Sequence, residues 1–188
     1  MPISLDESLV VFGNSNHLGH FLTYYETKIE EYGETEKDLT YAPNYFAWVY
    51  FASEQVFYRV KEMVCWNEQN EKTFDWTYKT LLDHLFSTYT PDVKEREALL
   101  LFAKIRHILV HKGFPNPHVT PSNNKREIAK GHIFEVSEII QLTSSLSSPK
   151  FYPSLRKKFS LAITAISSFE KEVNQNFGSC IIKKKRSK

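Results

Sequence analysis

Residues 153–177 read PSLRKKFSLAITAISSFEKEVNQNF, and the fold class is most readily predicted from this stretch. Apolar side chains recur in it every three or four positions, as they do on one face of an α-helix. They are Leu155, Phe159, Ala162, Ile163, Ile166, Phe169 and Val173. The stripe continues for about five helical turns, and Gly178 is predicted to end it. Such a helix must pack on others, so we expect it to be the longest element, or nearly so, of a helical bundle.

The same periodicity predicts five further helices. They cover about residues 16–33, 44–66, 74–87, 91–112 and 127–142, and the fourth has Pro91 in its first turn with Thr90 as its cap. Prolines predict an extended loop from Phe114 to Lys125, and Leu9–Phe12 is the single strand candidate. The predicted fold is therefore all-α, one bundle of five or six helices over residues 1–178, followed by a basic tail at 179–188.

Composition excludes several classes of protein. An apolar fraction of 41% with 14% aromatic residues is too high for a disordered chain. The two cysteines, Cys65 and Cys180, are too few for a disulfide framework, and we expect free thiols. Residues 1–8 lack the pattern of a signal peptide, and no stretch reaches the roughly 20 apolar residues that span a bilayer. We therefore expect a cytoplasmic protein with no membrane partner.

The net charge of +2 excludes a strongly basic, histone-like protein, but the charge is unevenly distributed. Five basic residues gather at the C-terminus, namely Lys183, Lys184, Lys185, Arg186 and Lys188. Two interpretations of this tail remain open. It either binds a phosphate backbone without sequence preference or is a solvated terminus.

The fourth predicted helix, EALLLFAKIRHILVHKG at 97–113, is apolar on two sides. One stripe is formed by Ala98, Leu101, Phe102, Ile105, Ile108 and Leu109. Leu99, Ala103 and Val110 form a second, narrower strip, and Arg106 lies between the two. A surface helix does not need a second apolar strip, so either another helix of the same bundle or a second protein chain must cover it.

Arginine and histidine together can support RNA cleavage without a metal. Attack by a ribose 2′-OH needs one group that accepts a proton and another that donates one, and histidine can do either near neutral pH. An arginine guanidinium stabilises the extra negative charge of the phosphorane. A zinc site built on His107 and His111 is the alternative, but it lacks an obvious third ligand, with only His118 and His132 as further candidates. We therefore expect neither a metal nor a cofactor.

The segment Arg106-His107-Ile108-Leu109-Val110-His111 resembles the R-x4-6-H motif of the HEPN superfamily, in the variant with a polar residue directly after the arginine. HEPN domains are small helical bundles in which the motif lies on a late helix, followed by a turn and a further helix. The order of helices over residues 16–177 is similar. The resemblance assigns Arg106 and His111 as the motif residues and His107 as the polar second position.

This resemblance implies a metal-independent endoribonuclease that acts in a toxin–antitoxin pair or in defence against phage. Two protomers of the family commonly form one composite cleft, which leaves 2′,3′-cyclic phosphate ends. RNA is then the substrate, a homodimer is the expected state, and an antitoxin or regulatory partner is a further expectation. Some family toxins carry a tyrosine two positions after the histidine that a partner modifies. Gly113 stands there in this chain, so we do not expect that modification.

Glu54, on the second predicted helix, is a candidate for holding Arg106 in position, as supporting acids do in some family members. The other interpretation of Glu54 is a partly exposed surface acid. The alternative function for the whole chain is an inactive HEPN bundle that binds RNA, nucleotides or another protein. Burial of Arg106 in a salt bridge away from any cleft would favour that alternative.

Overall fold

The computed structural model describes residues 5–33, 41–68, 76–111 and 125–186, with side chains described over 17–31, 43–65, 68, 76–110 and 125–172. Its helices are α1 (Leu5–Gly33), α2 (Tyr41–Glu68), α3 (Tyr78–Thr88), α4 (Val93–His111), α5 (Val136–Leu146) and α6 (Tyr152–Arg186), with a short 3₁₀ turn, η2 (Pro149–Phe151), before α6. β1 (Arg126–Ala129) and β2 (His132–Phe134) form a two-stranded sheet. The all-α bundle is confirmed, and α6, at 35 residues, is the longest described helix.

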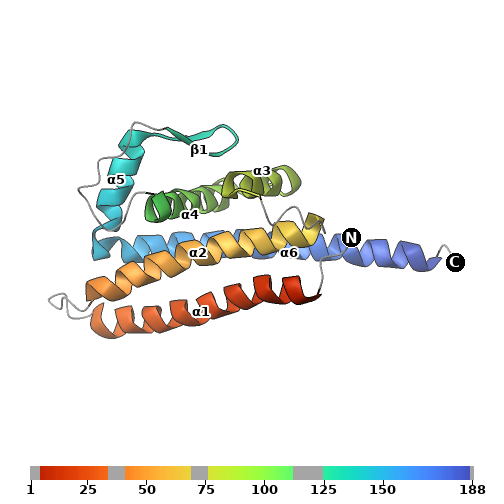
Figure 1. The fold of residues 1–188 in the computed structure, drawn as a ribbon, viewed down its shortest axis with the longest axis horizontal. Coiled ribbons are helices and arrows are strands. Elements are labelled where there is room, and N and C mark those ends of the chain that lie inside the picture. The colour runs from red at the N-terminus through yellow and green to blue at the C-terminus, as the bar shows by residue number, and fades with distance from the viewer. Residues whose placement is uncertain (1–4, 34–40, 69–75, 112–124, 187–188) are drawn as a thin grey trace.

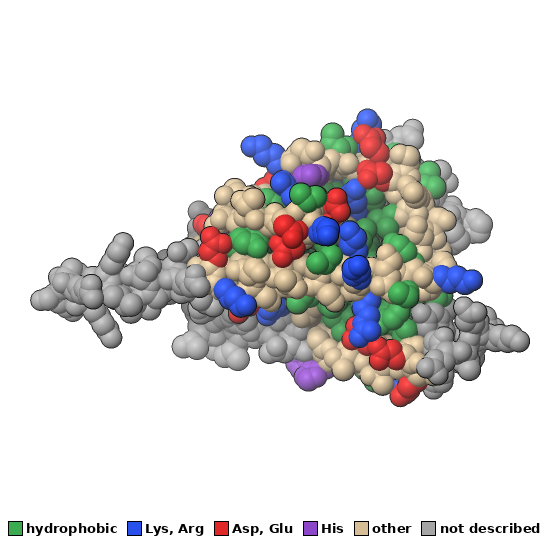
Figure 2. Space-filling model, turned by 180° about the vertical axis from the view of Figure 1, so that it is seen from behind, with side chains coloured by type: hydrophobic (Ala, Val, Ile, Leu, Met, Phe, Trp, Pro, Cys, Tyr) green, Lys and Arg blue, Asp and Glu red, His purple; other side chains and the backbone are tan. Residues whose placement is uncertain are grey.

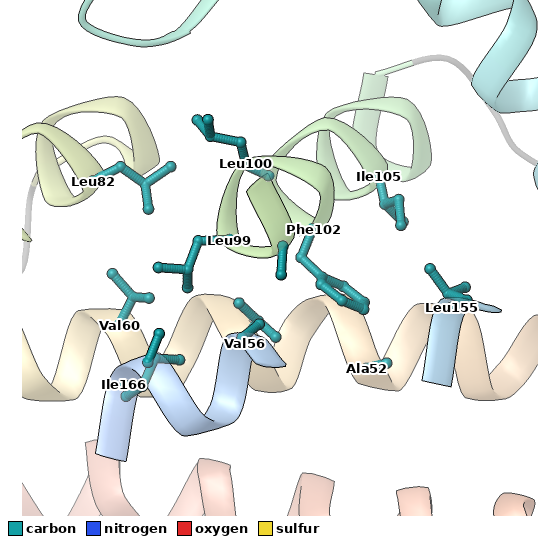
Figure 3. Packing of buried hydrophobic residues seen from close by; sticks show 14 of the residues in the cluster. Ala52, Val56, Val60, Leu82, Leu99, Leu100, Phe102, Ile105, Leu155 and Ile166 are labelled. Carbon is teal, nitrogen blue, oxygen red and sulfur yellow. The ribbon is translucent and has the colours of Figure 1, made fainter. Parts of the chain in front are cut away.

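The central helix of the bundle is α2, which contacts α1, α3, α4 and α6 (Figure 1). Its aromatic sequence explains this position, because Tyr45 and Trp48 are fully buried. Figure 3 shows Leu99 and Phe102 pointing from α4 toward α2, where Val56 lies. The next layer is α6, and the ring of Phe159 meets the ring of Phe102 edge-on at 5.7 Å between centroids. The helix that carries the motif is therefore packed into the core.

The region predicted as one helix over residues 127–142 is instead a β-hairpin followed by α5, so that prediction was wrong. The hairpin turns at Gly131, whose φ of 76° suits glycine and interrupts any helix there. Two carboxylates hold the turn: Asp83 accepts a hydrogen bond from the Lys130 N–H, and Glu127 accepts one from the Gly131 N–H. The hairpin lies on the α3–α4 side of the bundle, away from α1 (Figure 1).

Several helix boundaries also differ from the predictions, and α3 begins at Tyr78 rather than at Phe74. Residues 9–12, the strand candidate, lie within α1. Asp92, rather than Thr90, caps α4, because its carboxylate accepts a hydrogen bond from the Glu95 N–H at 2.8 Å. The Glu95 carboxylate in turn accepts a hydrogen bond from the Asp92 N–H. The backbone of α6 continues through Gly178 to Arg186, because a glycine inside a helix costs only about 1 kcal/mol and no proline follows.

The surface carries charges of both signs. On the face opposite to that of Figure 1, the described acidic and basic side chains lie among one another and no side of that face is covered by one sign alone (Figure 2). None of the described helices combines the length and the apolar character needed to cross a membrane.

Candidate functional site

Arg106 is held by an acidic residue of the central helix. The buried neighbours Ile105 and Ile108 fix the rotation of α4, and this turns Arg106 toward α2. There its Nε–H donates a hydrogen bond of 2.9 Å to Glu54 Oε1. The Glu54 side chain is only 10% exposed and that of Arg106 is 25% exposed. The predicted contact between these two residues is present, and Glu54 is a buried acid rather than a surface one.

Two aromatic rings complete the surroundings of Arg106. Its guanidinium carbon lies 3.8 Å from the centroid of the Phe57 ring, a close cation–π contact. Tyr78 meets Phe57 edge-on, with 5.0 Å between centroids. Arg106 is therefore fixed by a carboxylate and a ring face, while its hydrogen bond to Glu54 uses only one of the five guanidinium N–H groups.

The Tyr78 hydroxyl is buried and has no hydrogen-bond partner among the described residues. Burial raises the pKa of this phenol, the Arg106 charge opposes the rise, and the Glu54 charge adds to it. The phenol is consequently neutral at physiological pH. A buried hydroxyl without a partner costs about 1–3 kcal/mol of stability.

Arg106 also lines an open cleft of about 520 Å³. The start of α3, the middle of α4 and the strand β1 form its walls. The lining residues are Thr77, Tyr78, Lys79, Ala103, Arg106, His107, Arg126, Glu127 and Ile128. The salt bridge of Arg106 is thus inside one protomer but beside a cleft, so the condition that would favour a purely structural role is not met.

The charges of the cleft are mostly positive. Lys79 donates to Asp83 at 2.6 Å and lies 3.6 Å from Glu127, and the hydrogen bond to Asp83 raises the pKa of this lysine. His107 is half-buried, with its ring edge-on to Phe134 at 6.1 Å between centroids. Arg126 is exposed on β1. Such a surface fits an anionic ligand.

His111 is the last residue of α4, one helical turn after His107. Its side chain lies outside the described side chains. The backbone places His111 at the end of the motif helix. The fold brings Glu54 to Arg106, and Arg106 and His107 line the same cleft, while His111 follows on the same helix.

The second apolar strip of α4 is covered mostly by the chain itself. Leu99 and Ala103 are buried, which supports coverage within the bundle and removes them from any interface between chains. Val110 is 52% exposed. A second chain is therefore not needed to cover Leu99 and Ala103, because the neighbouring elements of the bundle already do so.

The zinc alternative gains no support from the described part of the chain, where no group of three or more histidine, cysteine, aspartate or glutamate side chains could hold a metal. His132 lies on β2, and His118 lies outside the described residues.

Three residues of the site were not selected from the sequence: Phe57, Tyr78 and Arg126. Phe57 lies three positions after Glu54, so the one helix face that presents the acid also presents the ring. The signal that could have found Arg126 is Gly131, since a glycine between two short segments is typical of a hairpin turn. Nothing in the sequence distinguished Tyr78 from the other nine tyrosines.

No family model matches this chain, and no curated protein or solved structure is significantly similar to it.

Proposed function

We propose that this protein is a metal-independent endoribonuclease of HEPN type that acts in a toxin–antitoxin or phage-defence role. The proposal rests on the resemblance of residues 106–111 to the family motif. The observation that carries it is the position of Arg106, fixed by Glu54 and Phe57 at the wall of a cleft that also contains His107. An arginine held in this way is preorganised to receive charge that develops on a phosphate.

In the proposed reaction the ribose 2′-oxygen attacks the adjacent phosphorus as its proton passes to a base. The bond to the 5′-oxygen breaks, and that oxygen takes a proton from an acid. The products are a 2′,3′-cyclic phosphate and a 5′-hydroxyl. His111 is the acid or base, and His107 orients the 2′-OH or the guanidinium. Arg106 stabilises the charged phosphorane through its planar N–H groups.

The proposed active form is a homodimer with a composite cleft, in which Val110 lies at or near the contact. An antitoxin or another regulatory protein is a further proposed partner. No cofactor is required by this chemistry, because the proton transfers and the charge stabilisation are supplied by side chains.

The second candidate function is an inactive HEPN bundle that binds RNA, nucleotides or another protein. The specific observation in its favour is that Arg106 already has a carboxylate and an aromatic partner within the protomer, as a structural arginine would. The two candidates differ in one measurable property, since only the first breaks a phosphodiester bond.

Cleavage of single-stranded RNA in EDTA tests the proposal. We expect the wild type to cut the RNA and His111→Ala to cut it about 10²–10⁴-fold more slowly. We expect Arg106→Lys to be inactive, because the lysine ammonium lacks the planar fork of a guanidinium. His20→Ala is the matched control, because His20 is exposed on α1. If His111→Ala cleaves within a few-fold of wild type, or if EDTA abolishes cleavage and a divalent ion restores it, the mechanism is wrong. RNA binding without cleavage would identify the inactive alternative.

A further inference from the structure

The β-hairpin forms one wall of the cleft and is attached firmly to α3. Asp83 of α3 connects the two, because it accepts a hydrogen bond from the backbone N–H of Lys130 in the hairpin turn. The same carboxylate accepts a hydrogen bond from Lys79 within α3. Lys79 also lies 3.6 Å from Glu127 of β1. A wall held at several points keeps its side chains in place relative to Arg106. Residues of β1 that line the cleft therefore have a defined position toward any ligand in it.

The cations of the cleft differ in how far their charge is already compensated. Arg106 is paired with Glu54, and Lys79 is paired with Asp83 and Glu127. Arg126 lines the cleft, is exposed, and makes no ion pair with any other residue in the described part of the chain. Among Arg106, Lys79 and Arg126, only the Arg126 guanidinium has no acidic partner in the described part of the chain. An arginine in this situation is suited to a phosphate group.

The start of α3 adds a partial positive charge to the same cleft. Thr77 is the N-cap of this helix, Tyr78 and Lys79 are its first two residues, and all three line the cleft. The Thr77 hydroxyl accepts a hydrogen bond from the Thr80 N–H, which leaves the N–H groups of Tyr78 and Lys79. Helix N-termini attract anions because their first N–H groups have no partner within the helix. The unpartnered Tyr78 hydroxyl lies in the same turn. These groups lie among the lining residues of one cleft together with Arg106 and Arg126.

We propose that Arg126 is a second phosphate-binding side chain, so that a single RNA strand runs from Arg106 past the first turn of α3 to the hairpin. This inference rests on the proposed function and adds to it a binding residue outside the motif. Arg106 receives the phosphate that reacts, and Arg126 binds a neighbouring phosphate. The site then takes an RNA strand in preference to a single nucleotide.

Binding of a short single-stranded RNA in which every ribose is 2′-O-methylated tests this inference, because such RNA cannot be cut by 2′-OH attack. Fluorescence anisotropy of the labelled RNA is measured over a series of salt concentrations. For Arg126→Gln we expect the dissociation constant to rise roughly tenfold. The slope of log affinity against log salt should become less steep by about 0.7, the value for one phosphate contact on a single strand.

Lys125→Gln is the matched control, because it removes the same charge from the preceding residue. Lys125 is 68% exposed, pairs with Glu135 at 3.1 Å, and does not line the cleft. We expect this variant to bind nearly as well as wild type with an unchanged salt slope. Equal losses for both variants would overturn the inference, since they would reflect net charge alone. Circular dichroism melting of Arg126→Gln, expected to match wild type, excludes misfolding as a cause.

The results separate this inference from the proposed function. RNA binding that depends on Arg126 in a protein that cuts no RNA supports the inference and overturns the nuclease activity. Cleavage with the same KM in wild type and Arg126→Gln supports the nuclease and overturns the inference. A wild type that neither binds nor cuts RNA overturns both.

Discussion

Glu54 is one of two buried acids on α2, the other being Glu62. The whole Glu54 residue is 8% exposed. Its carboxylate accepts a hydrogen bond from the Arg106 guanidinium, which lies 52 positions further along the chain. A buried carboxylate needs a cation, and the Arg106 guanidinium needs an anion to fix its orientation. Each of the two residues therefore holds the other in position, and a substitution at Glu54 is expected to act by displacing Arg106.

Glu54→Gln is predicted to lower both the stability and the proposed activity. The amide keeps the shape but loses the charge, so Arg106 keeps a weaker partner. We expect a loss of about 1–3 kcal/mol in unfolding free energy by urea titration. We also expect a fall in kcat with little change in KM, because the ground-state affinity for RNA depends mainly on other cations.

Glu97→Gln is the control for this variant, because Glu97 forms an exposed pair with Lys158. Its stability should change by less than about 1 kcal/mol. A Glu54→Gln protein as stable and as active as wild type would show that the pair does not position Arg106.

An acid on a core helix stands out because it requires a partner, and the resemblance to the HEPN superfamily, some members of which have a supporting acid on an early helix, matched Glu54 to Arg106. Phe57 and Tyr78 escaped the sequence analysis for the opposite reason. Aromatic residues are expected in a core, so their types carry no signal for a contact with a guanidinium. Only the packing of α2 against α3 and α4 determines which rings meet Arg106.

At the scale of the elements, α5 is attached to α4 by one ion pair. Lys104 of α4 donates to Glu138 of α5 at 2.7 Å, and Glu138 also accepts a hydrogen bond from the Glu135 N–H at the start of α5. The hydrogen bond from Lys104 lowers the pKa of Glu138 below its ordinary value of 4.5, against a smaller opposing effect of burial. The contact therefore depends on the carboxylate form.

The stability contributed by Glu138 should depend on pH with a defined sign. Because its pKa is lowered in the folded state, the contribution is present above pH 4.5 and is lost as the pH falls through the lowered value. We expect Glu138→Gln to be about 0.5 kcal/mol less stable than wild type near neutral pH, after allowance for solvent screening of a partly exposed pair. The difference should vanish in acid.

Urea titrations of both proteins between pH 7 and pH 3 measure this difference, with Glu97→Gln as the exposed control. A difference that stays constant through the acid range would show that the charge of Glu138 is not the cause.

The long helices were predicted correctly and the hairpin was not, for a physical reason. Each long helix repeats its apolar pattern over many turns, whereas β1 and β2 have only four and three residues. Residues 126–134 hold their form through tertiary contacts, chiefly Asp83 with the Lys130 N–H. A local sequence pattern contains no information about an acid 47 positions away.

At the scale of the whole molecule, three exposed apolar residues lie on the end of α4 that carries the motif and on the neighbouring hairpin and α5. They are Val110 on α4, Ile133 on β2 and Ile140 on α5, each about half exposed. Single exposed apolar residues are common in monomers. Val110 differs from the others because it lies between His107 and His111 in the sequence of the motif, where the proposed composite cleft requires a second chain.

We predict that the wild type is a dimer of twice 22.0 kDa at micromolar concentration and that Val110→Glu is a monomer. A carboxylate at an apolar contact is costly to desolvate and would meet its own copy across a two-fold axis. Light scattering after size exclusion measures both masses.

Val93→Glu is the control for this experiment, because Val93 is even more exposed but lies at the opposite end of α4. It should remain a dimer. A wild type that stays at 22.0 kDa contradicts the composite site.

The motif helix α4 packs between α2, which is synthesised before it, and α6, which is synthesised after it. Arg106 leaves the ribosome after Glu54 but before Phe159, whose ring covers Phe102 on the buried face of the same helix. Translation of the 35 residues of α6 takes roughly 2–7 s at 5–20 residues per second. During that interval the motif helix lacks one of the two surfaces that hold it. The core around α4 is consequently completed only after α6 has been synthesised, so the proposed nuclease acquires its full packing later than its motif helix.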